Sequence, residues 1–123
     1  MNAARAYRSV QNETASKERL MVLLFERALE HIRTATKALD ERKPREAVKP
    51  IAKATEIVIH LAATLDHKAA PALCKNLDRV YKFVIYRLTQ AQARKVAPPL
   101  REAERVFAPI VSAFATAVAK IKP

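Results

Sequence analysis

Apolar residues recur every three or four positions through the stretch from Ser16 to Leu39. This spacing puts one row of side chains on a single face of an α-helix, so it predicts a long amphipathic helix. The row consists of Met21, Phe25, Ala28, Ile32, Ala35 and Leu39. Ser16 can accept a hydrogen bond from a free amide of the first turn, and we expect it to be the N-cap. Leu20 and Leu24 widen the apolar side, which predicts cover from more than one direction.

Three further segments show the same helical period, and each begins at or close to a proline. Pro44, Pro71 and Pro98-Pro99 suit the first turn of a helix, where a missing N–H removes no hydrogen bond. The expected apolar rows are Val48, Ile51, Thr55, Val58, Ala62 and Leu65, then Leu73, Leu77, Val80, Val84, Leu88 and Ala91, and finally Leu100, Ala103, Phe107, Ile110, Phe114, Ala117 and Ile121. Pro50 predicts a late helix start or a kink, and Pro109 predicts a bend.

Four amphipathic helices with short links predict an all-α fold, an antiparallel up-down four-helix bundle. The first helix should end between Asp40 and Lys43. Residues 1–15 are expected to form a short N-terminal helical segment and link, and residues 16–123 to form the bundle. Tyr7 and Val10 lie one turn apart in the short segment, which would be marginal alone in water and must dock on the bundle or stay mobile.

The composition narrows the class of protein. The 123 residues include no glycine and one cysteine, which excludes a Gly-rich phosphate loop and an intrachain disulfide. A lone thiol suits a reducing cytoplasm, and no segment reads as a signal peptide or a membrane span. The net charge of +11 is compatible with an acidic partner, nucleic acid or an anionic membrane surface, or simply with solvated helix faces, since the cations are dispersed. We expect a soluble cytoplasmic protein without membrane insertion.

Candidate catalytic and metal-binding residues are few. Glu26 and Glu30 lie one turn apart and could act as an acid–base pair, although such pairs are usually solvated surface. Glu56 and His60 are also one turn apart, but a di-metal bundle needs Glu-x-x-His pairs and more carboxylates from facing helices. Cys74 is expected to be a small apolar filler. We therefore expect no enzyme activity, no cofactor and no metal site.

Several short motifs, separated along the chain, together point to a known family. They are Ala-Tyr-Arg-Ser-Val-Gln at 6–11, Thr-Ala-Ser-Lys-Glu-Arg-Leu at 14–20, Leu-Phe-Glu-Arg-Ala-Leu at 24–29, Leu-Asp at 65–66 and Asn-Leu-x-x-Val-Tyr at 76–81. None is specific alone, but their order and spacing over residues 5–92 resemble the flagellar secretion chaperone family, FliS. Lys17, Phe25 and Gln92 stand where that family often has Pro, Tyr and Asn, so the chain resembles a divergent, basic member.

This resemblance implies a cytoplasmic export chaperone. Such a protein binds the disordered C-terminal segment of flagellin, prevents premature polymerisation and delivers flagellin to the gate of the flagellar type III export apparatus. A disordered client can fold into helices against apolar grooves of a bundle, and a basic surface would speed encounter with an acidic client. We expect the N-terminal segment to cover part of the groove and to move when the client binds. The hypothetical client-binding residues are Tyr7, Val10, Leu20, Leu24, Leu77, Tyr81, Val84 and Leu88.

The alternative function is a basic helical bundle that binds nucleic acid non-specifically. Lys and Arg contacts to phosphates could supply affinity without sequence specificity. The sequence contains no recognisable DNA- or RNA-reading motif, and its Tyr and Phe residues stand at positions expected to be buried, where bases could not stack on them. Nucleic acid is therefore the less favoured partner.

Overall fold

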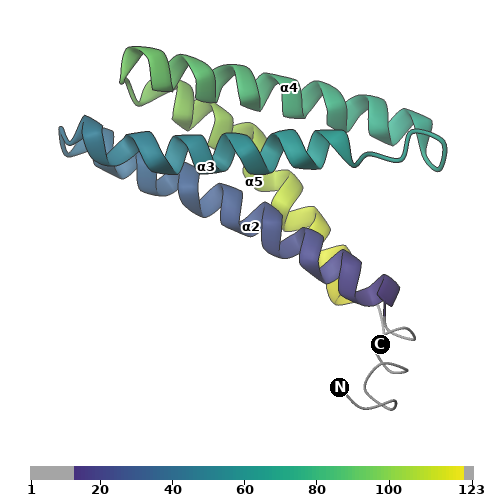
Figure 1. The fold of residues 1–123 in the computed structure, drawn as a ribbon. Helices are drawn as coiled ribbons and strands as arrows, with labels where there is room; N and C mark the ends of the chain where they lie inside the picture. Colours follow the sequence, from purple (N-terminus) through teal and green to yellow (C-terminus); the bar gives the residue numbers. More distant parts are fainter. Residues whose placement is uncertain (1–12, 121–123) are drawn as a thin grey trace, which may run out of the picture.

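The computed structural model describes residues 13–120, which form four α-helices (Figure 1). The helices are α2 (Glu13–Asp40), α3 (Pro44–Ala63), α4 (Pro71–Arg94) and α5 (Pro98–Ala119). Each packs against its neighbours in sequence, and α5 returns to pack against α2. The predicted all-α, antiparallel up-down bundle is confirmed, and residues 13–120 include no strand. No helix within this range is both long and apolar enough to cross a membrane.

An aromatic cluster forms the centre of the core. The ring centroid of Phe25 lies 5.0 Å from that of Phe114, 5.7 Å from that of Phe107 and 6.3 Å from that of Tyr81. Aromatic pairs at such distances add to the stabilisation that burial alone provides. The apolar row predicted for the first helix is confirmed, since its members are fully buried or packed on the core: Met21, Phe25, Ala28, Ile32, Ala35 and Leu39.

The other predicted rows are partly wrong in their rotation about the helix axis. In α3 the buried residues are Ala47, Ile51, Ala54, Val58 and Leu61, whereas Val48 is exposed. In α4, Cys74 and Tyr81 are buried while Leu73 is exposed. In α5, Val111 is buried and Ala117 is exposed. Close-packed interiors select side chains for shape as well as for hydrophobicity, so alanine can displace valine from the core.

The helix ends agree with the proline pattern but not with the expected N-cap. Pro44, Pro71 and Pro98 each occupy the first turn of a helix, as predicted. The helix α2 begins at Glu13, so the prediction that Ser16 caps it is wrong. Nothing in the residues just before Ser16 strongly opposes a helical backbone, which allows the helix to extend upstream. Pro50 lies inside α3, which excludes a late start of that helix.

Two turns contain left-handed residues other than glycine. Arg42, between α2 and α3, has φ 60°, and Lys95, which caps α4, has φ 56°. The Arg42 N–H donates to the Leu39 carbonyl at 3.1 Å, and the Lys43 N–H donates to the Ala38 carbonyl at 2.8 Å. These two bonds form a Schellman motif, in which glycine is the usual left-handed residue. Because the chain has no glycine, basic residues occupy both positions.

The helix α2 extends beyond α3 at its N-terminal end. It has 28 residues, against 20 in α3, and at a rise of 1.5 Å per residue the difference is roughly 12 Å. The short α2–α3 turn holds those two helices level at one end, so the excess length lies at the N-terminus of α2. In Figure 1, the beginning of α2 and the end of α5 run away from the loop that joins α3 to α4.

Predictions for the chain termini fall partly outside the part that the structure describes. The short N-terminal segment, with Tyr7 and Val10, lies outside it apart from residues 13–15, which belong to α2. Ile121 at the end of the last predicted row lies outside it as well.

Candidate functional site

The N-terminal half of α2 exposes large apolar side chains. Leu20 is 57% exposed and Leu23 is 61% exposed, and the two lie three residues apart on one side of the helix. We call this pair the leucine ridge. Met21 and Leu24 beside it are partly buried and pack on the core. Full burial of a leucine is worth about 1.5–3 kcal/mol, so the ridge is a surface that gains free energy when another molecule covers it.

A groove of about 350 Å³ lies on one side of the ridge, between α2 and the end of α3. Its apolar lining consists of Leu20, Met21, Leu24 and Leu61, and its polar lining consists of Lys17, Glu18, His60 and Thr64. One carboxylate oxygen of Glu18 is buried without a hydrogen-bond partner. A buried acceptor that lacks a donor is unfavourable.

A second groove, of about 390 Å³, lies on the other side of the ridge, between α2 and the end of α5. It is lined by Arg19, Val22, Leu23, Ala115, Val118 and Ala119. The leucine ridge therefore stands between two largely apolar grooves. Both grooves lie near the ends of the helices that flank α2, since Thr64 follows the last residue of α3 and Ala119 is the last residue of α5.

The structure divides the eight predicted client-binding residues into three groups. Leu20 and Leu24 lie in the first groove. The α4 residues are at most 8% exposed and belong to the core, so a partner reaches them only if helices separate: Leu77, Tyr81, Val84 and Leu88. Tyr7 and Val10 are outside the described range. Sequence reasoning missed Leu23, although the apolar run from Leu20 to Phe25 is wider than one buried face can accommodate.

The buried side chains of Tyr81 and Cys74 in α4 have structural roles. Burial raises the pKa of Tyr81 to about 12, and the nearby Cys74 acts in the same direction. Tyr81 is therefore neutral at physiological pH. The Cys74 thiol is buried, as expected for a small core residue, and its Sγ donates to the Asp66 carbonyl at 3.2 Å.

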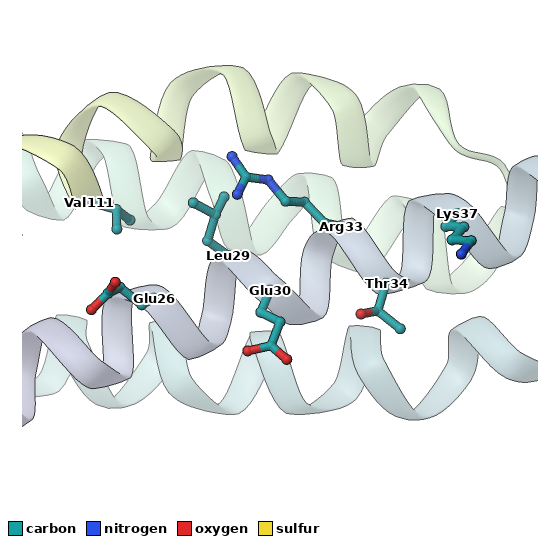
Figure 2. Close-up of a pocket in the computed structure, with 7 residues that line it drawn as sticks. All are labelled: Glu26, Leu29, Glu30, Arg33, Thr34, Lys37 and Val111. Carbon is teal, nitrogen blue, oxygen red and sulfur yellow. The ribbon is translucent and has the colours of Figure 1, made fainter.

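The two carboxylates considered for acid–base chemistry line a third groove, of about 480 Å³ (Figure 2). Glu26 and Glu30 are both exposed on the outer side of α2, and Val111 of α5 contributes the opposite edge. Arg33 reaches away from them toward α5, where its Nε lies 3.5 Å from Glu104 Oε1. The groove is a surface of mixed charge that contains neither histidine nor cysteine. Within residues 13–120, no three potential metal ligands come together.

A fourth groove, of about 440 Å³, lies between α3 and α4. Its lining is small, apolar or uncharged: Ile51, Ala52, Thr55, Leu88, Thr89, Gln92 and Ala93. Gln92 Nε2 donates to the Val48 carbonyl at 2.9 Å, which ties the two helices together beside this groove. Leu88, although buried in the core, is thus the one α4 member of the predicted client-binding set that also borders a groove among the four described here.

Two aromatic residues of α4 are more exposed than predicted. Phe83 is 36% exposed and Tyr86 is 58% exposed, so the expectation that the Tyr and Phe residues are buried is wrong at these positions. The guanidinium carbon of Arg87 lies 5.2 Å from the ring centroid of Phe83 and 5.9 Å from that of Tyr86. Such cation–π contacts hold the rings and the cation together on the surface.

The chain is similar to known flagellar proteins over nearly its whole length. The family model described as flagellar protein FliS matches residues 1–121. The flagellar secretion chaperone FliSB of Pseudomonas aeruginosa is 30% identical over 118 residues, which are 93% of this chain and 94% of that protein. The flagellar secretion chaperone FliS of Vibrio cholerae serotype O1 is 26% identical over 113 residues, which are 89% of this chain and 83% of that protein. With its full-length match and its four-helix bundle, this chain belongs to the FliS family.

Proposed function

We propose that this protein is a cytoplasmic flagellar export chaperone. In this proposal it binds the disordered C-terminal segment of flagellin, prevents its premature polymerisation and delivers it to the type III export gate. Membership of the FliS family, together with the names of the two relatives, supports the chaperone class. The observation that carries the binding step is the leucine ridge between its two apolar grooves.

The client chemistry follows from the shape of this surface. An amphipathic segment that folds on binding can place side chains three or four residues apart into one groove. Ordering such a segment costs about 2–5 kcal/mol or more, and micromolar affinity corresponds to a net gain of about 8 kcal/mol. Burying the remaining exposed area of two leucines supplies only a few kcal/mol of this. We therefore propose that the client follows both grooves and covers the ridge between them.

The client is proposed to leave the core of α4 intact. Tyr81 and Val84 are almost fully buried, and exposing each such side chain would cost about 1.5–3 kcal/mol. Binding through them would therefore require a compensating contact for every core residue uncovered. Their proposed role is to hold the bundle together, while Leu20, Leu24 and the leucine ridge contact the client.

Residues 1–12 are proposed to regulate access to this surface. They are joined to the N-terminus of α2, which adjoins the first groove. We propose that Tyr7 and Val10, which this attachment would allow to reach the client surface, cover it in the free protein. Deletion of residues 1–10 should then change client affinity while the bundle stays folded. Unchanged affinity with a large fall in melting temperature would instead assign these residues a purely structural role.

Isothermal titration calorimetry with a synthetic C-terminal flagellin peptide tests the client surface. The double variant Leu20→Ala/Leu23→Ala should raise the Kd about tenfold or more, because each truncation removes apolar area worth about a kcal/mol when covered. The matched control is Ile59→Ala, because Ile59 is 51% exposed and lines none of the four grooves. Circular dichroism should show that all variants remain folded. Equal effects of the ridge and control variants, or no binding by the unaltered protein, would refute the proposal.

A further inference from the structure

The outer side of α4 carries cations and aromatic rings that the chaperone proposal does not use. We call the set the α4 strip: Lys75, Arg79, Lys82, Phe83 and Tyr86. At 100° per residue these positions share the side of the helix opposite the buried Leu77, Val84 and Leu88. All five are exposed. The strip spans about 16 Å along the helix axis, since eleven residues separate its ends.

Of the four helices, α4 carries the largest net positive charge. The helix α4 contains five basic residues and one acidic residue, a net charge of +4, whereas α2 contains five of each. The single acid, Asp78, lies beside Lys82, with 2.8 Å between its Oδ2 and the Lys82 Nζ. Within residues 13–120, no carboxylate forms an ion pair with Lys75 or Arg79. The strip therefore presents cations whose charge is available to an anionic ligand.

Neighbouring side chains fix the exposed rings in place. Gln90 Nε2 donates to the Tyr86 hydroxyl at 3.1 Å, and Arg87 Nη1 donates to Gln90 Oε1 at 2.8 Å. Arg87 Nη2 also pairs with Glu102 Oε2 of α5 at 2.7 Å. Because Arg87 contacts both aromatic rings, this chain of bonds orders Phe83 and Tyr86 before any ligand arrives. A pre-ordered ring loses little entropy when another flat group stacks on it.

We propose that the α4 strip binds single-stranded nucleic acid. Phe83 and Tyr86 offer ring faces on which unpaired bases stack, and Lys75, Arg79 and Lys82 contact successive phosphates. This combination of cations and aromatic platforms is what sequence-independent single-strand binding requires. A helical peptide would need a groove, and none of the four grooves described above includes a residue of the strip. A duplex keeps its bases stacked inside, so it cannot use the rings.

Fluorescence anisotropy with labelled oligo(rU) and oligo(dT) tests this proposal on the full chain. Both oligonucleotides should bind at low salt, and affinity should fall steeply between about 50 and 200 mM salt. Tyr86→Ala should weaken binding about 5- to 150-fold, whereas Tyr86→Phe, which keeps the ring, should bind nearly as well as the unaltered protein. Lys75→Gln and Arg79→Gln should each reduce the slope of log K against log salt by about 0.7.

The matched control removes one positive charge from another face of the bundle. Lys37→Gln changes an exposed lysine on the outer side of α2, and it should leave the affinity within about twofold. Thermal melts should show that each variant is folded, as expected for changes at exposed positions. Three results would overturn the proposal: no binding of either oligonucleotide at low salt, equal losses from Lys37→Gln and Lys75→Gln, or binding of poly-glutamate as tight as that of the oligonucleotides and insensitive to Tyr86→Ala. The last result would assign the strip to acidic peptides.

Discussion

Replacing Phe25 by alanine should remove the centre of the core and destabilise the fold strongly. Phe25 is fully buried and its ring contacts Tyr81, Phe107 and Phe114, which come from α4 and α5. Truncation of a buried phenylalanine costs about 3–5 kcal/mol, and each aromatic pair contributes about 0.5–1.5 kcal/mol beyond its buried area. With three such pairs, we expect Phe25→Ala to fall at the upper end, about 4–5 kcal/mol. Ile32→Ala, which is equally buried but has no ring, should cost less, about 2–4 kcal/mol.

Urea unfolding followed by far-UV circular dichroism measures these losses as differences in the free energy of unfolding. Leu23→Ala is the control on the same helix, because its exposed side chain should contribute less than about 1 kcal/mol. Since small domains have only about 5–15 kcal/mol of stability, Phe25→Leu provides a milder variant that should remain folded and lose less than Phe25→Ala. A loss below about 1.5 kcal/mol for Phe25→Ala, or a larger loss for Leu23→Ala, would refute the assignment of this ring to the centre of the core.

Two further predictions concern titration. Burial, followed by the charge of Lys53, lowers the pKa of His31 below 6.5, so the unfolded state takes up this proton first as the pH falls. The stability that His31 contributes is complete above about pH 6.5 and is lost as the pH falls below this value. Between about pH 7.5 and 5.5, the melting temperature of His31→Gln should therefore fall less than that of the unaltered protein. Because the pKa of Tyr81 is raised to about 12 from 10.0, unfolding should be favoured as the pH rises above 10.0. In a spectrophotometric titration, Tyr81→Phe should lose the phenolate that forms last, and loss of an earlier one would contradict the burial of Tyr81.

The buried face of a helix is predictable from the sequence where apolar residues stand singly among polar ones. Phe25, Ala28 and Ile32 are separated by charged residues over much of their row, so only one rotation of that helix buries them all. In α4, by contrast, Leu73 precedes Cys74 and Val80 precedes Tyr81, and these adjacent apolar pairs allow two rotations that differ by 100°. The contact between the rings of Tyr81 and Phe25 belongs to the packed structure, and local spacing does not contain it.

The candidate site was predictable only in part, for a related reason. Leu20 and Leu24 can be identified from the sequence because they make the apolar side of the helix wider than one row of side chains, which is a local property. Their exposure depends on where α3 and α5 end relative to α2, which is a relation between helices distant in sequence. The exposure of Tyr86 is not predictable for the same reason, since an aromatic residue at helical spacing does not reveal whether another helix covers it.

The left-handed turn at Arg42 has a consequence for the unfolded chain. A residue other than glycine in this conformation costs about 1–2 kcal/mol in the folded state. A glycine at the same position would avoid that strain, but it would also give the unfolded chain more backbone freedom, which is worth about 0.4–1 kcal/mol. The second effect offsets only part of the first, so this turn forms without glycine at a net cost of up to roughly 1.5 kcal/mol. The same balance applies at Lys95, and at both sites the restricted denatured ensemble compensates for only part of the strain in the native turn.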